Sequence, residues 1–262
     1  MTNNQHSRHL DLEGAYNIRD IGGYETVDSR TVRLRKLFRS DSLHNLAKGS
    51  QEELIGEGLR TVIDLRQSDA VEEKPNVFEH SSDLTYHHLN VMGDGPLVES
   101  TDQSVSSLGP DRPPEVYAAI LDMRQQWMGK VIKLLATPGA LPALYHCNSG
   151  RDRAGLTTML LLSIAGVPKQ QIVEDFAMSP RYLWRRTHDK NTGTVHNLHP
   201  DDFDSSPEAR QAYDTEKNIC PPQAMSASIE HIERTYGSVR EYLVGGGVTE
   251  EEMRLLRSEI VE

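Results

Sequence analysis

The chain has 262 residues, 37% of them hydrophobic, and a formal net charge of −11 at pH 7. That length and apolar content suit one α/β domain, and the negative charge argues against general binding to nucleic acid. No apolar run approaches the roughly 18 residues of a membrane span, and the use of only two cysteines predicts a reducing, cytoplasmic location.

Taken in chain order, the expected elements alternate between strands and helices. Residues 1–10 are expected to be disordered, and residues 11–262 to form one domain. Strands are expected near 36–40, 60–65, 84–89 and 141–146. Helices are expected at 50–57 behind a capping box at Ser50-Gln51-Glu52-Glu53, at 116–136, at 156–165, from Pro168 to before Pro180, and near 222–235 and 249–258. This alternation predicts a doubly wound, mostly parallel sheet flanked by helices.

Two segments rich in loop-forming residues interrupt this pattern, at about 93–114 and 187–220. Long irregular segments in compact domains are often lids, so we expect both to cover a site. The second contains His188, His196 and His199, but their spacing matches no zinc pattern, and no metal is expected there.

The most informative segment joins the last expected strand to a buried helix that ends at Gly166. It reads His146-Cys147-Asn148-Ser149-Gly150-Arg151-Asp152-Arg153-Ala154-Gly155. A turn of this kind directs amide N–H groups and the positive end of a helix dipole toward one point, where an anion can bind. The phosphate-binding residues expected here are Asn148, Ser149, Gly150, Arg151, Asp152 and Arg153.

Cys147 is the expected nucleophile of this loop. The amides, the helix dipole and Arg153 all favour the thiolate over the thiol. Arg153 can bind two phosphoryl oxygens at once, while Gly150 and Gly155 allow positive φ and close backbone approach. Attack on phosphorus would give a cysteinyl-phosphate that water hydrolyses, a route that needs no metal or cofactor. A free cysteine in a core strand is the alternative for Cys147 taken alone.

Four separated motifs extend the pattern. They are Asn17-Ile18-Arg19-Asp20-Ile21-Gly22-Gly23-Tyr24, Phe38-Arg39-Ser40-Asp41, Val62-Ile63-Asp64-Leu65-Arg66 and Tyr236-Gly237-Ser238-Val239. With the HC-x5-R loop, they make the chain resemble cysteine-dependent phosphatases from about residue 11 to 257. The closest pattern is the bacterial tyrosine-protein-phosphatase-like branch, whose members carry NxRDxGGY, FRSD, VIDLR and HCxAGKDRTG. The resemblance implies phosphatase activity on a phosphorylated substrate.

The loop departs from the family pattern at two positions. Arg151 replaces the usual lysine, which keeps the charge and changes the hydrogen-bond geometry. Ala154 stands where the family carries Thr or Ser, whose hydroxyl is thought to help the cysteine leave during hydrolysis of the intermediate. We therefore expect phosphate binding to persist and the second step to be slow.

Two aspartates are candidates for the general acid that protonates the leaving oxygen. Asp152 lies in the loop itself, and its alternative role is to orient a neighbouring arginine. Asp94 follows the strand expected at 84–89, where the resemblance places a proposed acid, and its alternative role is that of a turn residue between glycines. The sequence does not choose between them.

Several further charged residues are expected to support the loop rather than react. They form a buried salt-bridge network in this interpretation, with substrate contact as the alternative. The set is His146, Asp64, Arg66, Arg19, Asp20 and Arg39, with Ser40 and Asp41 beside them. The second thiol, Cys220, is expected to be a structural or free surface cysteine.

Three functional hypotheses follow. The first is a phosphomonoester hydrolase acting on phosphotyrosine, or more broadly on other phosphoproteins and phosphoinositides, as the resemblance implies. The second keeps the chemistry and moves it to a small phosphorylated metabolite. The third, motivated by Ala154, is a module that binds phosphate esters with little or no turnover. The sequence leaves the oligomeric state open.

Overall fold

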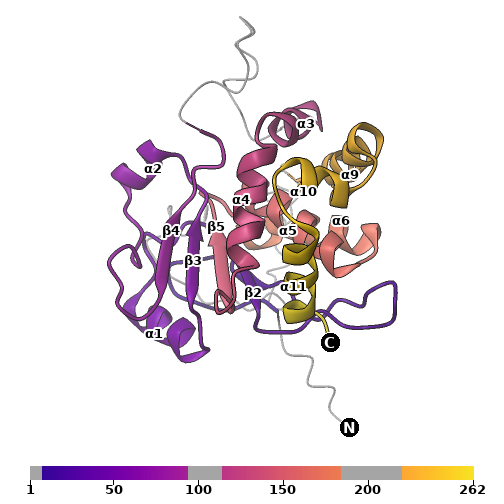
Figure 1. Cartoon of the computed structure of the whole chain (residues 1–262). Coiled ribbons are helices and arrows are strands. Elements are labelled where there is room, and N and C mark those ends of the chain that lie inside the picture. Colours follow the sequence, from indigo (N-terminus) through magenta and orange to yellow (C-terminus); the bar gives the residue numbers. More distant parts are fainter. Residues whose placement is uncertain (1–7, 94–113, 184–219) are drawn as a thin grey trace, which may run out of the picture.

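The computed structural model describes residues 8–93, 114–183 and 220–262, which form an α/β fold around one five-stranded sheet (Figure 1). The strands follow the spatial order β1-β2-β5-β3-β4. Their bounds are β1 Arg19–Asp20, β2 Leu37–Ser40, β3 Thr61–Asp64, β4 Thr85–His88 and β5 Ala143–His146. β1 pairs antiparallel with β2, and every other pair is parallel, so the expected mostly parallel sheet is confirmed.

Helices cover both faces of this sheet. They are α1 Lys48–Gly56, α2 Ser68–Glu73, α3 Pro114–Met123, α4 Gln125–Leu135, α5 Asp152–Ala165, α6 Lys169–Ala177, α9 Pro222–Tyr236, α10 Val239–Gly245 and α11 Glu250–Ile260. Figure 1 shows α3 to α6 and α9 to α11 grouped on one side of the sheet. None of the helices in the described ranges combines the length and apolar character that a membrane crossing requires.

Two hydrophobic cores form because strand side chains alternate between the faces. Leu37, Ile63 and Tyr145 point into the larger core, which α3 to α6 and α9 to α11 complete. Their neighbours Phe38, Val62 and Leu144 point to the opposite face, into a smaller core that includes Leu54 of α1. Burial on both faces explains why two adjacent positions in each of these short strands are apolar.

The register of the parallel strands brings their carboxyl ends to one edge. Ser40 of β2 and Asp64 of β3 are both aligned with His146 of β5. The expected strands are all present, and β1 is an addition that the sequence did not indicate. Ligands of open α/β sheets bind at this edge, so the polar residues that end β2, β3 and β5 lie where a site is expected.

Two helix boundaries differ from the expected ones. α1 begins at Lys48 rather than at Ser50, because the Gln51 amide already donates to the Ala47 carbonyl one turn earlier. The expected capping box is therefore wrong. A capping box occurs instead at α11, where the Thr249 hydroxyl accepts from the Glu252 amide and Glu252 accepts from the Thr249 amide.

The helix expected over 116–136 is two helices separated at Arg124, which has φ −116° and ψ 17°. α3 packs against α9, whereas α4 packs against α10. In the second contact Gly129 lies so close to the Gly246 carbonyl that a Cβ at residue 129 would overlap it. The two halves pack on different helices, which accounts for the change of direction.

The last residues of the N-terminal segment expected to be disordered, 8–10, are described by the structure. Of residues 1–10, the first seven lie outside the described residues, but His9 forms a β-bridge with Arg19 and Leu10 is buried in the smaller core. Residues 8–10 therefore belong to the fold. Most of the two segments expected to be lids, 93–114 and 187–220, lies outside the described residues.

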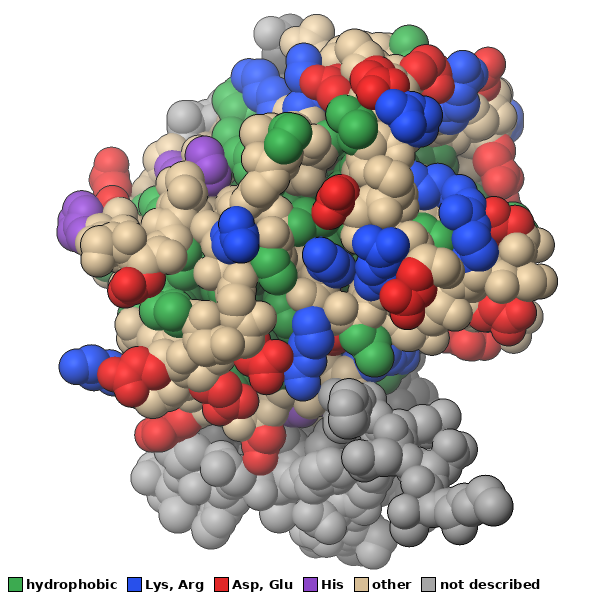
Figure 2. Space-filling model, turned by 60° about the horizontal axis from the view of Figure 1, so that its bottom comes forward, with side chains coloured by type: hydrophobic (Ala, Val, Ile, Leu, Met, Phe, Trp, Pro, Cys, Tyr) green, Lys and Arg blue, Asp and Glu red, His purple; other side chains and the backbone are tan. Residues whose placement is uncertain are grey.

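The surface carries charges of both signs. On the face brought forward in Figure 2, lysine and arginine side chains lie among aspartate and glutamate side chains instead of forming one basic surface. Exposed ion pairs such as Arg30–Asp28 (2.7 Å) and Arg254–Glu251 (2.6 Å) also occur on the surface of the described residues. A mixed surface of this kind provides no extended cationic track for a nucleic-acid backbone on that face.

Candidate active site

The loop of residues 147–151 joins the carboxyl end of β5 to the N-terminus of α5. Gly150 has φ 65°, and a Cβ at this position would lie 2.5 Å from the Ser40 carbonyl carbon and oxygen. Only glycine therefore fits, as the sequence predicted. Gly155 differs from its expectation: it is helical, and a Cβ there would lie 2.9 Å from the Phe176 ring. It permits close packing of α5 on α6 rather than a positive φ.

Carbonyl groups of the loop are held outward by the surrounding protein. The Ser42 amide donates to the Asn148 carbonyl (3.2 Å), and Nδ2 of Asn17 donates to the Ser149 carbonyl (2.9 Å). Nη2 of Arg39 donates to the Gly150 carbonyl at 2.7 Å. Because C=O and N–H point in opposite directions in a trans peptide, these contacts turn the following amide N–H groups toward the concave side of the loop. That arrangement is suited to an anion.

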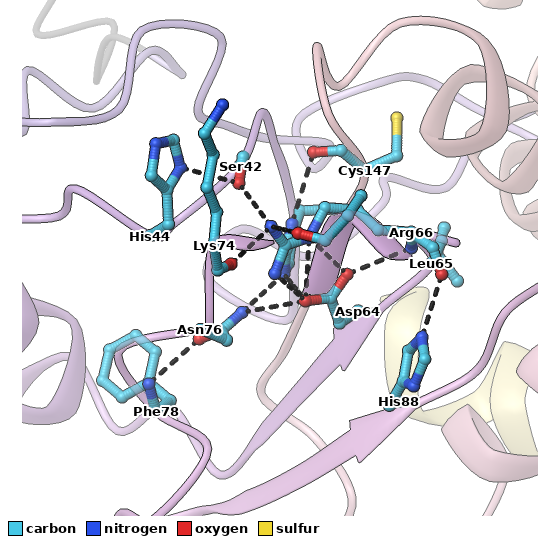
Figure 3. A network of polar contacts seen from close by, with 12 residues as sticks. Ser42, His44, Asp64, Leu65, Arg66, Lys74, Asn76, Phe78, His88 and Cys147 are labelled. Carbon is cyan, nitrogen blue, oxygen red and sulfur yellow. Dashed lines mark hydrogen bonds and ion pairs between the residues drawn. The ribbon is translucent and has the colours of Figure 1, made fainter. Parts of the chain in front are cut away.

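Cys147 opens this loop and its side chain is only 1% exposed. Figure 3 shows its sulfur pointing away from the Asp64–Arg66 pair. Ala154 is fully buried in the first turn of α5. Among the described residues, no side-chain hydroxyl forms a hydrogen bond with the Cys147 sulfur.

Two arginines of the loop retain unused donors. Arg153 donates from Nη1 to the Leu65 carbonyl (3.1 Å), and Arg151 donates from Nε to both carboxylate oxygens of Asp152 (3.1 and 3.2 Å). In the part of the chain that the structure describes, no acceptor lies within reach of Nε and Nη2 of Arg153, or of either terminal nitrogen of Arg151. Both guanidinium groups are mostly buried and can donate to a bound anion.

Asp152 is held as a hydrogen-bond acceptor. In addition to Arg151, the Tyr117 hydroxyl donates to its Oδ1. Burial and the neighbouring Asp152 carboxylate raise the pKa of Tyr117 well above its usual value, so Tyr117 remains a donor. Asp152 therefore accepts from both neighbours. Contacts of this kind are those expected of the orienting role that was the alternative for Asp152, and its role stays a prediction.

Asp64, at the end of β3, joins the strand edge to the loop (Figure 3). Arg66 donates to it from Nε (2.9 and 3.0 Å) and from Nη2 (2.6 Å), while Nε2 of His146 lies 3.4 Å from its Oδ2. Nδ2 of Asn76 lies 2.7 Å from the same His146 nitrogen. Burial would raise the pKa of Asp64, but its contacts with His146 and Arg66 hold that pKa well below the usual range.

The remaining donors of Arg66 are also occupied. Nη1 donates to the Ser42 hydroxyl (3.1 Å) and to the Lys74 carbonyl (2.9 Å), and the side chain is 1% exposed. Since Ser42 in turn holds the Asn148 carbonyl, Arg66 acts on the loop through its neighbours. All of these contacts of Arg66 are with protein groups, as expected of a supporting residue, and its role stays a prediction.

A second buried network centres on Asp175 of α6, a residue that sequence analysis missed. Arg39 donates to its Oδ2 (2.6 Å), Arg19 to its Oδ1 (3.2 Å), and the Tyr24 hydroxyl to its Oδ1 (3.1 Å). All three charged side chains are fully buried. Burial would raise the pKa of Asp175, but Arg19 and Arg39 more than offset it, and the pKa is held below its usual range. A signal was present, because Asp175 shares a helix face with the apolar Ile172.

Asp20 takes no part in these loop contacts. Its carboxylate accepts from the backbone amides of Gly22 (2.8 Å) and Arg35 (2.6 Å), and burial raises its pKa. It therefore ties together the two ends of the loop 21–36 that connects β1 to β2. The neighbouring Asp41 serves the loop more directly, since it accepts from the amides of Tyr16 and Asn17 (both 3.0 Å), and Asn17 holds the Ser149 carbonyl.

The other predicted site residues have different outcomes. Asp94 and the three histidines considered for a metal lie outside the described residues. Cys220 is 1% exposed, and burial raises the pKa of its thiol to about 12, so it is a buried cysteine rather than a surface one. Among the described residues, no group of three or more His, Cys, Asp or Glu side chains could hold a metal ion.

Known proteins similar to this chain carry phosphatase names. Residues 10–262 match the tyrosine phosphatase family. A tyrosine-protein phosphatase of Nostoc commune is 27% identical over 220 residues, which are 84% of this chain and 72% of that protein. The triple specificity protein phosphatase PtpB of Mycobacterium tuberculosis is 23% identical over 278 residues, covering 94% of this chain and 97% of that protein. The family match extends over nearly the whole sequence, and the chain therefore belongs to the tyrosine phosphatase family.

Proposed function

We propose that this phosphatase hydrolyses phosphomonoesters through a cysteinyl-phosphate intermediate on Cys147. The observation that carries the proposal is the loop itself, whose carbonyls are held outward by Ser42, Asn17 and Arg39 while its amides remain for an anion. The N-terminus of α5 adds a positive dipole end behind the same loop. Together these groups favour both a bound phosphate dianion and an ionised thiol.

The reaction follows from this geometry in two steps. The Cys147 sulfur attacks phosphorus, and the bond from phosphorus to the leaving oxygen breaks as that oxygen receives a proton. Water then attacks phosphorus and gives its proton to the conjugate base of the general acid, the sulfur–phosphorus bond breaks, and inorganic phosphate and the thiolate are released. The free donors of Arg153 are suited to the equatorial oxygens, whose charge shifts during both steps.

The substrate class is proposed from the relatives. One relative is named a tyrosine-protein phosphatase and another a triple specificity protein phosphatase. We therefore propose phosphotyrosine as the first substrate, with broader activity on other phosphoproteins or on phosphoinositides. Specificity depends on residues around the loop, and it is a property of the site rather than of the fold.

A substrate panel tests the proposal. Purified full-length protein is assayed with para-nitrophenyl phosphate, phosphotyrosine, phosphoserine and phosphothreonine peptides, phosphoinositides and a set of phosphorylated metabolites, with EDTA present. The expected result is that, of all substrates in the panel, the phosphotyrosine peptide is hydrolysed with the highest kcat/KM. A preference for one metabolite would mean that the substrate is a small phosphorylated metabolite, with the same cysteine-dependent mechanism. Phosphate binding without any turnover would overturn the proposed hydrolase.

The identity of the general acid is tested by leaving-group dependence. Asp94→Asn is expected to reduce kcat/KM for phenyl phosphate by roughly a hundredfold, and for para-nitrophenyl phosphate far less, because only the poorer leaving group needs the proton. Asp152→Asn is expected to reduce both rates by a similar factor, because Asp152 already accepts hydrogen bonds from Tyr117 and Arg151. A selective loss in the Asp152 variant would reverse the assignment.

The second step is expected to be slow because of Ala154. In wild type, a rapid burst of para-nitrophenolate should precede a slower steady state. Ala154→Thr is expected to raise the steady-state rate by about tenfold, the equivalent of one hydrogen bond to the departing sulfur. Ala154→Val is the matched control, since valine has the same shape without the hydroxyl. Equal rates in the two variants would contradict the proposed role of the hydroxyl.

A further inference from the structure

Tyr117 of α3 has its polar end at the phosphate loop and its ring in the core. The side chain is fully buried, and its ring packs edge-on against Phe176, with centroids 6.0 Å apart and an interplanar angle of 88°. Its hydroxyl donates to Oδ1 of Asp152. A buried tyrosine hydroxyl needs such a partner, and here the partner is a carboxylate in the first turn of the helix that starts at the loop.

Asp152, held by Tyr117, in turn fixes the orientation of the Arg151 guanidinium. It engages only Nε of that guanidinium, at 3.1 and 3.2 Å, and leaves the terminal nitrogens without an acceptor in the described part of the chain. A long arginine side chain loses considerable rotamer freedom when it is fixed, so a partner that is itself fixed lowers the cost of holding one orientation. Tyr117, Asp152 and Arg151 thus form a continuous chain from α3 to the loop.

We propose that Tyr117 is a positioning residue, which holds Asp152 so that the terminal nitrogens of Arg151 face the bound phosphoryl group. This inference rests on the proposed function, because it assigns a role within the same anion site. Arg151 would contact the anion directly, and Tyr117 would act only through Asp152. Burial and the Asp152 carboxylate raise the pKa of Tyr117 well above its usual value, so its hydroxyl keeps the proton that it donates to Asp152.

Binding of inorganic phosphate, measured by titration calorimetry on the full-length protein, tests this role without requiring turnover. Tyr117→Phe keeps the ring and its contact with Phe176 and removes only the hydroxyl. It is expected to weaken phosphate binding about three- to tenfold, as for loss of orientation of one charged donor. KM for para-nitrophenyl phosphate should rise by a similar factor, with kcat changed less than KM.

Two controls separate positioning from general stability. Tyr242→Phe removes another buried tyrosine hydroxyl, which donates to the Leu121 carbonyl (2.8 Å) and not to a residue of the loop. This variant should leave phosphate affinity unchanged. In an Arg151→Met background, Tyr117→Phe should have no further effect on phosphate affinity. A full further loss in that background, or unchanged affinity in Tyr117→Phe alone, would overturn the positioning role.

The same experiments distinguish this inference from the proposed function. If wild-type protein binds phosphate but hydrolyses no ester, the proposed hydrolase activity is wrong. The calorimetric comparison of wild type with Tyr117→Phe would still decide the role of Tyr117. Wild-type protein that does not bind phosphate would overturn both. Hydrolysis with unaltered phosphate affinity in Tyr117→Phe would leave the hydrolase and remove only the positioning role.

Discussion

Cys147→Ser is expected to lower kcat for para-nitrophenyl phosphate by at least about a thousandfold, since it removes the nucleophile of a site whose groups act as a unit. A serine hydroxyl is not ionised at neutral pH. Among the described residues, no base contacts the side chain of residue 147, since Nδ1 of His146 lies against its carbonyl oxygen instead (3.4 Å). Inorganic phosphate should still bind, because the amides and Arg153 that hold it are unchanged. Steady-state kinetics and calorimetry on the same preparation measure the two effects.

Cys220→Ser is the matched control. Cys220 is equally buried at 1% exposure. Its thiol lies within electrostatic range of Arg151 and Asp152 but is not part of the loop, so most of the activity should remain. Rapid acid quench during turnover should trap phosphate on the wild-type and Cys220→Ser proteins but not on the Cys147→Ser protein. Full activity in Cys147→Ser would remove the thiolate mechanism and return the residue to the role of a core cysteine.

The strand and helix that carry the loop could be predicted from local pattern. The run before His146 is apolar and short, the run after Gly155 is apolar and helical in length, and Gly166 ends the helix with φ 87°. Each feature depends on residues close in sequence. By contrast, β1 consists of two residues held by pairing with β2, and the separation of α3 from α4 depends on packing against α9 and α10. Those are long-range effects that periodicity does not contain.

In the site, too, some features depend on local sequence and others on residues far apart in the chain. Charges inside buried strands, as at Arg39 and Asp64, imply that partners exist, because an unpaired buried charge is costly. The sequence did not identify those partners. Asp175 is 136 residues from Arg39, and Asn76 is 70 residues from His146. Tyr117 was hidden for another reason, since a tyrosine in an apolar helix pattern reads as an ordinary core residue.

Asp175→Asn is expected to destabilise the fold by about 3–5 kcal/mol, the usual cost of removing one partner of a buried ion pair. The amide would leave Arg19 and Arg39 buried with each other and without a compensating charge. Urea unfolding measures the loss in free energy. Phosphate affinity should fall as well, because Arg39 also donates to the Gly150 and Arg151 carbonyls (2.7 and 3.3 Å) that shape the loop.

Asp28→Asn is the control for loss of a carboxylate that pairs with two arginines. Asp28 lies at the surface, where it contacts Arg30 at 2.7 Å and Arg257 at 3.1 Å. Exposed pairs contribute little, so this variant should unfold at nearly the wild-type urea concentration and bind phosphate normally. Equal stability of the two variants would show that burial of the Asp175 network does not stabilise the fold.

The pH dependence gives an independent check with a defined sign. The folded-state pKa of Asp175 lies below its unfolded value of about 3.9, because Arg19 and Arg39 offset the effect of burial. A carboxyl group with a lowered folded pKa contributes its full stabilisation above the unfolded pKa and loses it as the pH falls toward the folded pKa. The difference in unfolding free energy between wild type and Asp175→Asn should therefore be constant near neutrality and shrink below about pH 4. A difference that grew on acidification would mean that the carboxyl group is protonated in the native protein, and that Arg39 is held at the loop by other contacts.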